Sequence, residues 1–156
     1  MTITSGLMSS NKQDWSTPQE FMDKLPVTFD LDVCAYDSTT KAPKWFTEAD
    51  DAFTKQWEGR CWMNPPYGQA LPKWLEKAYK ESLCSYCDAI WCLIPARTDT
   101  KWFHNIACKG KIILLKGRVS FEQNGKPVGS PAFPSMLVIY DKKVNPAIVT
   151  WDWKND

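Results

Sequence analysis

The sequence predicts an α/β fold, in which a sheet carries helices on its faces. Two short runs, residues 89–94 and 112–115, are continuously apolar, as strands buried on both faces are. Residues 71–79 and 102–107 place apolar side chains at the three- and four-residue spacing of amphipathic helices. Strands that alternate with helices along the chain are typical of this fold class.

The bulk composition is that of an ordinary globular protein. The chain has 156 residues, of which 44% are hydrophobic and 24% charged, and this suits one domain with a core. We expect residues 1–12 to be a flexible lead-in and residues 13–156 to form the single domain. The sequence shows no membrane-length apolar run and no signal-peptide pattern, so we expect a cytoplasmic protein with no membrane partner.

The first half of the chain is expected to contain one helix and three strands. The helix begins at Ser16 or Thr17, carries Pro18 in its first turn and ends at Pro26. The first strand is predicted from strict alternation of apolar and polar residues, and the third leads directly into a proline-rich loop. The expected strands are residues 27–35, 44–47 and 60–63.

The second half is expected to contain two helices and four strands. One helix begins near Ala70, and Thr98 or Thr100 caps the other, which ends at Gly110. Residues 117–135 hold three glycines and three prolines, and we expect them to form a loop. The last two strands are expected to pair as an antiparallel hairpin at the edge of the sheet. The expected strands are residues 89–94, 112–115, 136–140 and 147–151.

The cysteines do not indicate a metal site. Several of the six lie inside apolar runs, where cysteine behaves as a small hydrophobic residue. Cys84 and Cys87 have CxxC spacing, but the chain has no second such pair and its one histidine is His104, whereas a zinc site needs about four ligands. We expect no metal and reduced thiols.

Charge is distributed unevenly along the chain. Residues 14–58 contain ten acidic residues and four lysines, whereas residues 101–143 contain eight basic residues and two acidic ones. A basic second half suits a polyanionic partner, and an acidic first half suits a cationic or hydroxyl-rich ligand. The alternative is that both are solvated surfaces.

The loop Asn64-Pro65-Pro66-Tyr67 has the strongest chemical character. The Asn64 amide and the Pro65 carbonyl supply hydrogen-bond acceptors, Tyr67 supplies an aromatic face, and two prolines make the loop rigid. These groups suit a flat molecule that carries an amino group. The alternative is an ordinary turn at the end of a strand.

Two further segments are expected at strand ends. Residues 32–35 and residues 50–51 carry polar and acidic side chains. Ligands of open α/β sheets bind at the carboxyl ends of the strands. All three segments should therefore meet at one edge of the sheet, which favours a site over a turn.

Several stretches together resemble the motifs of one enzyme family. Asn64-Pro65-Pro66-Tyr67 resembles the catalytic motif of amino-group methyltransferases, and Asp14-Trp15-Ser16-Thr17-Pro18 resembles a Thr-Pro motif that helps to hold the methionine end of the cofactor. Asp32-Val33-Cys34-Ala35 resembles the first cofactor loop, and Asp50-Asp51-Ala52-Phe53 resembles the element that meets adenosine. Residues 117–121 and 130–135 resemble a C-terminal signature. From about Asp14 to Tyr140 the chain resembles the phage-type DNA N-6-adenine methyltransferases, a Dam-like family that uses S-adenosylmethionine.

The resemblance implies a compact Rossmann-like methyltransferase sheet with flanking helices and an antiparallel C-terminal hairpin. It implies S-adenosylmethionine as cofactor and DNA as partner. The implied catalytic residues are Asn64, Pro65, Pro66 and Tyr67. The implied cofactor-binding residues are Trp15, Thr17, Pro18, Asp32, Cys34, Ala35, Asp50 and Asp51. The implied DNA-binding residues are the cations Arg97, Lys101, Lys116 and Arg118, for the phosphates, and the aromatics Phe121 and Phe133, for the base.

The implied reaction is direct methyl transfer to the N6 amino group of an adenine flipped out of the helix. The Asn64 oxygen and the Pro65 carbonyl are expected to accept the two amino hydrogens, which aims the nitrogen lone pair at the methyl group. Tyr67 is expected to stack on the base. The glycine-rich G-x-G loop of broader methyltransferases is absent, so Asp32, Cys34 and Ala35 must take its place.

Other substrates stay open at this level. The same loop serves methylation of RNA bases, of a glutamine amide in proteins and of cytosine N4, and a chain that had lost catalysis would be a nucleic-acid-binding module. The sequence does not define the target DNA sequence or the oligomeric state. No separate target-recognition domain fits in this length, so loops such as residues 117–135 would carry any sequence preference.

Overall fold

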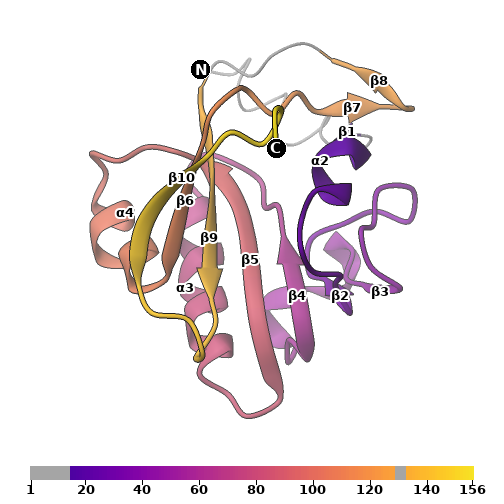
Figure 1. Ribbon diagram of the computed structural model, residues 1–156. Helices are drawn as coiled ribbons and strands as arrows, with labels where there is room; N and C mark the ends of the chain where they lie inside the picture. The colour runs from indigo at the N-terminus through magenta and orange to yellow at the C-terminus, as the bar shows by residue number, and fades with distance from the viewer. Residues whose placement is uncertain (1–14, 129–132) are drawn as a thin grey trace.

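The computed structural model describes residues 15–128 and 133–156 (Figure 1). The expected lead-in at residues 1–12, and Asp14, lie outside the described residues. The α-helices are α2 (Gln19–Asp23), α3 (Leu71–Ser82) and α4 (Lys101–Asn105), and the short 3-10 helices are η3 (Glu48–Asp50), η4 (Ala52–Thr54) and η5 (Ala107–Lys109). The main-sheet strands are β2 (Leu31–Asp32), β3 (Lys44–Trp45), β4 (Gly59–Met63), β5 (Cys87–Pro95), β6 (Lys111–Leu115), β9 (Ser135–Tyr140) and β10 (Ala147–Trp151).

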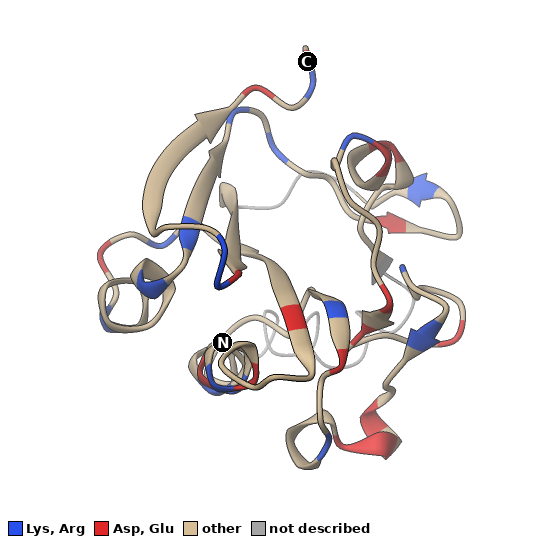
Figure 2. Cartoon of the chain, turned by 60° about the horizontal axis from the view of Figure 1, so that its bottom comes forward, with Lys and Arg blue, Asp and Glu red and all other residues tan. Residues whose placement is uncertain are grey.

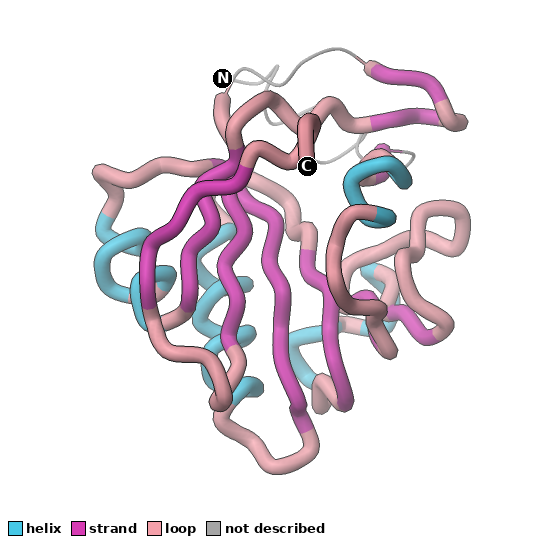
Figure 3. Tube along the Cα trace, viewed as in Figure 1, coloured by secondary structure: helices cyan, strands magenta, loops and turns pink. Residues whose placement is uncertain are grey.

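The seven strands form one sheet in the order β10-β6-β9-β5-β4-β2-β3. Neighbouring strands are parallel except at β9, which is antiparallel to both β5 and β6. The helices α3 and α4 lie on one face of this sheet (Figure 3). The predicted α/β class is confirmed, and the arrangement is consistent with a methyltransferase fold.

The predicted pairing of the last two strands is wrong. β9 and β10 run in opposite directions, as in a hairpin, but β6 lies between them and pairs with both. The reason lies in their burial: all six residues of β9 are buried, whereas four of the five residues of β10 are exposed, including Ile148 at 58%. A strand that is apolar on both faces is stabilised most in the centre of the sheet, which leaves the edge to β10.

The strand predicted at residues 27–35 is shorter than expected. Only Leu31–Asp32 is regular strand, but backbone hydrogen bonds extend the pairing on both sides of it. Asp30 N donates to the Arg60 carbonyl and Val33 N donates to the Trp62 carbonyl, at 2.8 and 3.0 Å. The predicted position was therefore right and the length too great.

Side chains alternate between two cores, one on each face of the sheet. Along β4 and β5, Cys61, Met63 and Ile90 point to the core beneath α3, whereas Trp62 and Trp91 point to the opposite core. This second core is closed by α2, by residues near Phe121 and by Trp153 of the C-terminal segment. Both faces of the central strands are thus buried, as their continuous apolar runs predicted.

A small second sheet lies above the carboxyl ends of the parallel strands of the main sheet (Figure 1). Its strands are β1 (Trp15–Ser16), β7 (Glu122–Gln123) and β8 (Lys126–Pro127). β7 and β8 form a hairpin within the segment expected to be a loop, and its two-residue turn has both residues at positive φ, Asn124 at 54° and Gly125 at 79°. Asn-Gly is a strong hairpin signal that the loop interpretation overlooked. Because β1 pairs with β7, the hairpin fixes the backbone just before Thr17.

Within the described parts of the chain, no helix is long and apolar enough to cross a lipid bilayer.

Candidate active site

The carboxyl ends of β2 and β4 mark the point where the chain changes direction across the sheet. After β2 the chain forms β3 on one side of it, then returns to form β4 on the other side. In open α/β sheets the crevice at such a point is where ligands bind. Asp32 is the last residue of β2, and Asn64 follows the last residue of β4, so both lie at this crevice.

A pocket opens at this place. It is lined by Ser16, Thr17, Asp32, Cys34, Tyr36, Thr39, Lys41, Trp62, Asn64 and Pro66. Three segments that the sequence singled out separately therefore share one cavity: the Thr-Pro segment, the loop after Asp32 and the Asn64 loop. Sequence reasoning missed five of the lining residues, namely Ser16, Tyr36, Thr39, Lys41 and Trp62. The polar residues that follow Ala35 were the available signal for three of them.

The Asn64 side chain is held at both ends of its amide. Its Nδ2 donates to Thr17 Oγ1 at 3.1 Å, and its Oδ1 accepts from the Tyr67 hydroxyl at 2.9 Å. The Tyr67 hydroxyl also lies 3.4 Å from the Leu93 carbonyl of β5. Asn64 is 8% exposed and Thr17 is 2% exposed, so these bonds form away from bulk water, where a hydrogen bond is electrostatically stronger.

Tyr67 is part of the second core. Burial raises the pKa of its phenol well above the usual value, so the hydroxyl stays protonated. Its ring centroid lies 6.1 Å from that of Phe121 and 5.5 Å from that of Phe133. Tyr67 and Phe121 are buried, whereas Phe133 is half-buried and has the Arg97 guanidinium 5.5 Å from its ring centroid. Stacking of these rings on a target base stays a prediction.

Asp32 holds the loop that follows β2, which lacks the G-x-G glycines of broader methyltransferases. Its Oδ1 accepts from the Cys34 backbone N–H at 3.2 Å, and its Oδ2 accepts from the Lys41 backbone N–H at 3.0 Å. One buried carboxylate thus bonds near both ends of the segment from Cys34 to Lys41. The Ala35 N–H donates to the Phe46 carbonyl at 3.0 Å, which anchors the same segment to β3.

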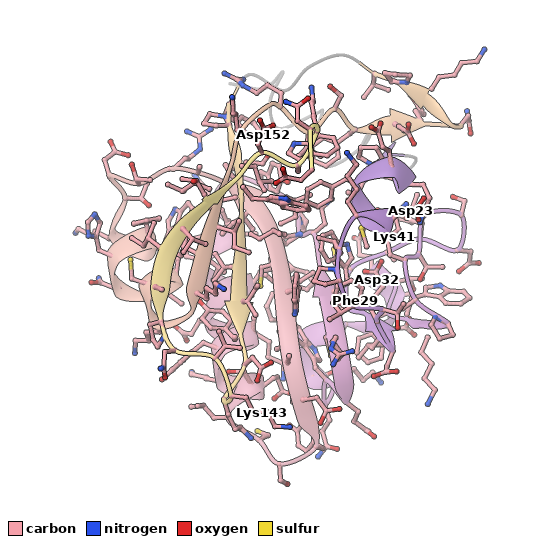
Figure 4. All side chains as sticks on the ribbon, viewed as in Figure 1. Asp23, Phe29, Asp32, Lys41, Lys143 and Asp152 are labelled. Carbon is pink, nitrogen blue, oxygen red and sulfur yellow. The ribbon has the colours of Figure 1, made fainter. Side chains whose placement is uncertain are left out.

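Lys41 brings a positive charge to the same pocket (Figure 4). Burial lowers the pKa of its ammonium group, and the negative charges of Asp32, Glu122 and Asp23 oppose this effect. Its Nζ donates to Gln19 Oε1 at 3.3 Å. Among the side chains that line the pocket, Asp32 is the carboxylic acid and Lys41 is the amine.

Comparison with known proteins identifies the family of this chain. A family model described as DNA N-6-adenine-methyltransferase (Dam) matches residues 4–156. The chain belongs to this family. It is also 30% identical over 155 residues to the DNA N-6-adenine-methyltransferase of Haemophilus phage HP1 (strain HP1c1), an alignment that covers 92% of this chain and 87% of the relative. No solved structure matches significantly. The resemblance stated from the sequence is confirmed, and with it the enzyme class, an adenine-specific DNA methyltransferase.

Five of the predicted cofactor-binding residues of this methyltransferase lie outside the pocket. Asp50 lies on η3 and Asp51 directly after it, and both are exposed. Figure 2 shows acidic residues gathered at the lower right of the chain. Hydrogen bonds from Thr47 to the Asp50 carboxylate lower the pKa of that group, so Asp50 acts as a cap of η3. Pro18 is buried at the start of α2, and Ala35 is buried beside Asp32. Their contacts with a cofactor stay predictions, as do those of Trp15, which pairs through its backbone in β1.

The four predicted phosphate-binding cations follow the carboxyl ends of the central strands. Arg97 and Lys101 come after β5, Lys116 and Arg118 come after β6, and all four are exposed. Lys116 Nζ lies 3.5 Å from the Asp152 carboxylate. These side chains lie at the same edge of the sheet as the pocket, which is where a DNA substrate of a methyltransferase would have to approach.

The described residues contain no group of three or more His, Cys, Asp or Glu side chains placed to hold a metal ion. The six cysteines are free thiols. The ring of His104 is hydrogen-bonded to the Thr98 carbonyl at 2.8 Å, which gives this histidine a local structural role on α4.

Proposed function

We propose that this methyltransferase transfers a methyl group from S-adenosylmethionine to the N6 amino group of adenine in DNA. The observation that carries the proposal is the position of the Asn64 amide in the wall of a pocket that it shares with Thr17 and Asp32. An acceptor for an amino group and a candidate cofactor loop thus line the same cavity.

The donor set of the pocket fits S-adenosylmethionine. The amino-acid end of this cofactor carries an ammonium group and a carboxylate, and the pocket offers the Asp32 carboxylate and the Lys41 ammonium as opposite charges. Hydroxyl groups of Thr17 and Thr39 add neutral hydrogen-bonding partners. When bound, the cofactor supplies a methyl group activated by a sulfonium centre.

The contribution of the protein to the reaction is orientation and electrostatic stabilisation. The adenine amino group is a poor nucleophile because its lone pair is delocalised into the ring. Asn64 Oδ1 has two lone pairs, of which Tyr67 uses one, so the other is available to an amino hydrogen. The Pro65 carbonyl would accept the second hydrogen, and both acceptors stabilise the positive charge that develops on nitrogen.

The adenine must leave the DNA helix to reach Asn64. Unstacking a base costs a few kcal/mol, and stacking on an aromatic side chain returns about 1–3 kcal/mol. Phe133 is the half-buried ring beside Tyr67 and is therefore the most accessible of the three predicted aromatic contacts. The exposed cations after β5 and β6 would contact phosphates on either side of the flipped nucleotide. We place the reaction in the cytoplasm, and in the bacterial host cytoplasm if this chain is encoded by a phage, as its relative is.

Substitution of Asn64 tests the proposal. Asn64→Ala should abolish transfer of tritiated methyl groups to duplex DNA, with a loss of at least about 100-fold in kcat, because it removes an acceptor used in the transition state. Binding of S-adenosylhomocysteine, measured by calorimetry, should stay within about threefold of the wild type. Asn105→Ala is the matched control, because Asn105 is exposed on α4.

The product decides between substrates. Mass spectrometry of digested DNA should detect N6-methyladenine, and sequencing would then locate the methylated sites. Label that appeared in RNA, in a protein glutamine or at cytosine N4 would contradict the adenine assignment. DNA binding without any calorimetric signal for the cofactor would indicate an inactive binding module. Turnover near wild type in Asn64→Ala would contradict the proposed role of Asn64.

A further inference from the structure

We propose that Thr17 and Tyr67 are positioning residues that fix the plane of the Asn64 carboxamide for the incoming amino group. The inference rests on the proposed function, because it concerns how the acceptor Asn64 is oriented. It gives the hydroxyl groups of Thr17 and Tyr67 an indirect part in the reaction, through their hydrogen bonds to Asn64. It also gives the Tyr67 hydroxyl a role that is separate from any stacking by its ring.

A carboxamide without partners rotates about the bond that joins it to the side chain, because that terminal torsion is broad. In this structure each end of the Asn64 amide has a hydroxyl partner, Thr17 Oγ1 at 3.1 Å and Tyr67 Oη at 2.9 Å. Two partners at opposite ends define the amide plane. The remaining lone pair of Oδ1 then has a fixed direction before substrate arrives, which is the condition for efficient orientation of a reactant.

The Thr17 hydroxyl is itself held in place. Its residue is almost completely buried between β1, which pairs with β7, and the start of α2 at Gln19. The carbonyl of Pro18 accepts hydrogen bonds from the Phe21 and Met22 N–H groups at 3.0 and 3.3 Å, so the backbone after Thr17 is fixed by the first turn of α2. A hydroxyl on such a rigid segment can orient its partner.

The Tyr67 hydroxyl is held equally firmly. Its ring is packed in the second core against Phe121 and Phe133, and its oxygen lies between Asn64 Oδ1 and the Leu93 carbonyl. The phenol keeps its proton because burial raises its pKa. The chain of contacts Thr17–Asn64–Tyr67–Leu93 therefore joins the wall of the cofactor pocket to the central strand β5.

Thr17→Val and Tyr67→Phe each remove one hydroxyl and keep the shape of the side chain. We expect each variant to lower kcat about tenfold, while KM for DNA and the dissociation constant of S-adenosylhomocysteine change less than about threefold. Thr17→Ser restores the hydroxyl and should return kcat to within about twofold of wild type. Tyr140→Phe is the control for the loss of a buried phenol, since its hydroxyl bonds to the Ile106 carbonyl and should leave kcat unchanged.

A second measurement needs no turnover. In ¹⁵N-labelled protein, the Asn64 side-chain amide hydrogens should exchange with solvent at least about tenfold faster in Thr17→Val than in wild type, and Thr17→Ser should restore protection. Unchanged kcat and unchanged protection in both variants would overturn the inference. A loss confined to cofactor affinity would also overturn it, because Thr17 would then act on the cofactor alone. If wild type methylates no DNA adenine, the proposed function fails, while the exchange measurement still decides the positioning.

Discussion

Trp153 should be one of the largest single contributors to stability, although it is the fourth residue from the end of the chain. Its side chain is buried, and its ring packs edge-on against Phe21 of α2 with centroids 5.1 Å apart. Its Nε1 donates to the Gly117 carbonyl at 3.1 Å, and its carbonyl accepts from Lys24 Nζ at 2.7 Å. The C-terminal segment thus packs against α2, the helix that follows Thr17, and is hydrogen-bonded to Lys24 at its end.

Trp153→Ala should reduce the free energy of unfolding by about 3–5 kcal/mol, the usual cost of deleting a buried aromatic side chain. For a domain of this size, about 2–4 °C of melting temperature is lost per kcal/mol, so we expect a decrease of about 6–20 °C. Trp153→Phe keeps most of the ring contact with Phe21 and loses the part-buried hydrogen bond to the carbonyl of Gly117, which is an exposed residue. Its cost should be nearer to about 1 kcal/mol.

Urea unfolding followed by circular dichroism measures both variants against wild type. Because Trp153 packs on α2, Trp153→Ala should also weaken binding of S-adenosylhomocysteine, whereas Trp153→Phe should affect it little. A loss below about 1 kcal/mol in Trp153→Ala would refute the reasoning, because no buried aromatic anchor is that easily replaced. Equal losses in the two variants would show that the hydrogen bond and not the ring carries the effect.

Two further predictions concern stability. Burial raises the pKa of the Tyr140 phenol above its ordinary value of 10, so above pH 10 the phenol ionises only when the protein unfolds. The free energy of unfolding should therefore fall by up to about 1.4 kcal/mol per pH unit above pH 10. Urea unfolding of Tyr140→Phe at pH 9–11 should lack this contribution to the pH dependence. Gly59 has φ 79°, and a Cβ there would meet Asp30 Oδ2 at 2.6 Å, whereas a Cβ on Gly125, also at φ 79°, would meet nothing within 4 Å. Gly59→Ala should therefore cost more than Gly125→Ala, for which the backbone strain alone is about 1–3 kcal/mol; equal unfolding midpoints would contradict this.

Regular patterns in the sequence predicted most of the fold. The apolar run at residues 89–94 became the centre of β5, and the helical spacing from Leu71 to Tyr79 became α3. These predictions succeed because each depends on the burial of one element against a sheet, which a local period of two or 3.6 residues reports directly. Thr100, one of two candidate caps, does cap α4, since its Oγ1 accepts from the Phe103 N–H at 3.2 Å.

Strand pairing was the part that local patterns could not supply. A hairpin between residues 136–140 and 147–151 satisfies the same periodicity as the observed order, in which β6 separates the two strands. The difference depends on competition for the centre of the sheet, and this competition involves strands far apart in sequence. The β7–β8 hairpin could have been predicted from the sequence, because Asn-Gly is a local hairpin signal. It was missed because the prolines of the same segment indicated a loop.

In the site, too, local sequence patterns predicted some features and missed those that depend on the folded chain. The positions of Asn64 and Asp32 beside one pocket were predictable, because each follows a strand and carries a group with clear chemistry. The acidic pair at residues 50–51 has the same composition, but Asp50 uses its carboxylate to cap η3, and neither residue lines the pocket. Composition alone does not distinguish an acidic residue that lines a pocket from one that caps a helix. The hydroxyl bond from Tyr67 to Asn64 was not visible from the sequence either, because it depends on the folded path of the loop.

The short spacing between the predicted cofactor loop and the Asn64 loop has a structural explanation. Only about thirty residues separate Asp32 from Asn64, which leaves no room for several intervening strand–helix units. The chain places a single short strand, β3, on the outer side of β2 and then returns to β4 on the inner side. Because β2 and β4 are neighbours in register, with Asp32 opposite Trp62, the two loops emerge side by side. A small methyltransferase can therefore assemble both halves of its site across one strand pair, and the Thr17–Asn64 bond closes the site from the N-terminal segment.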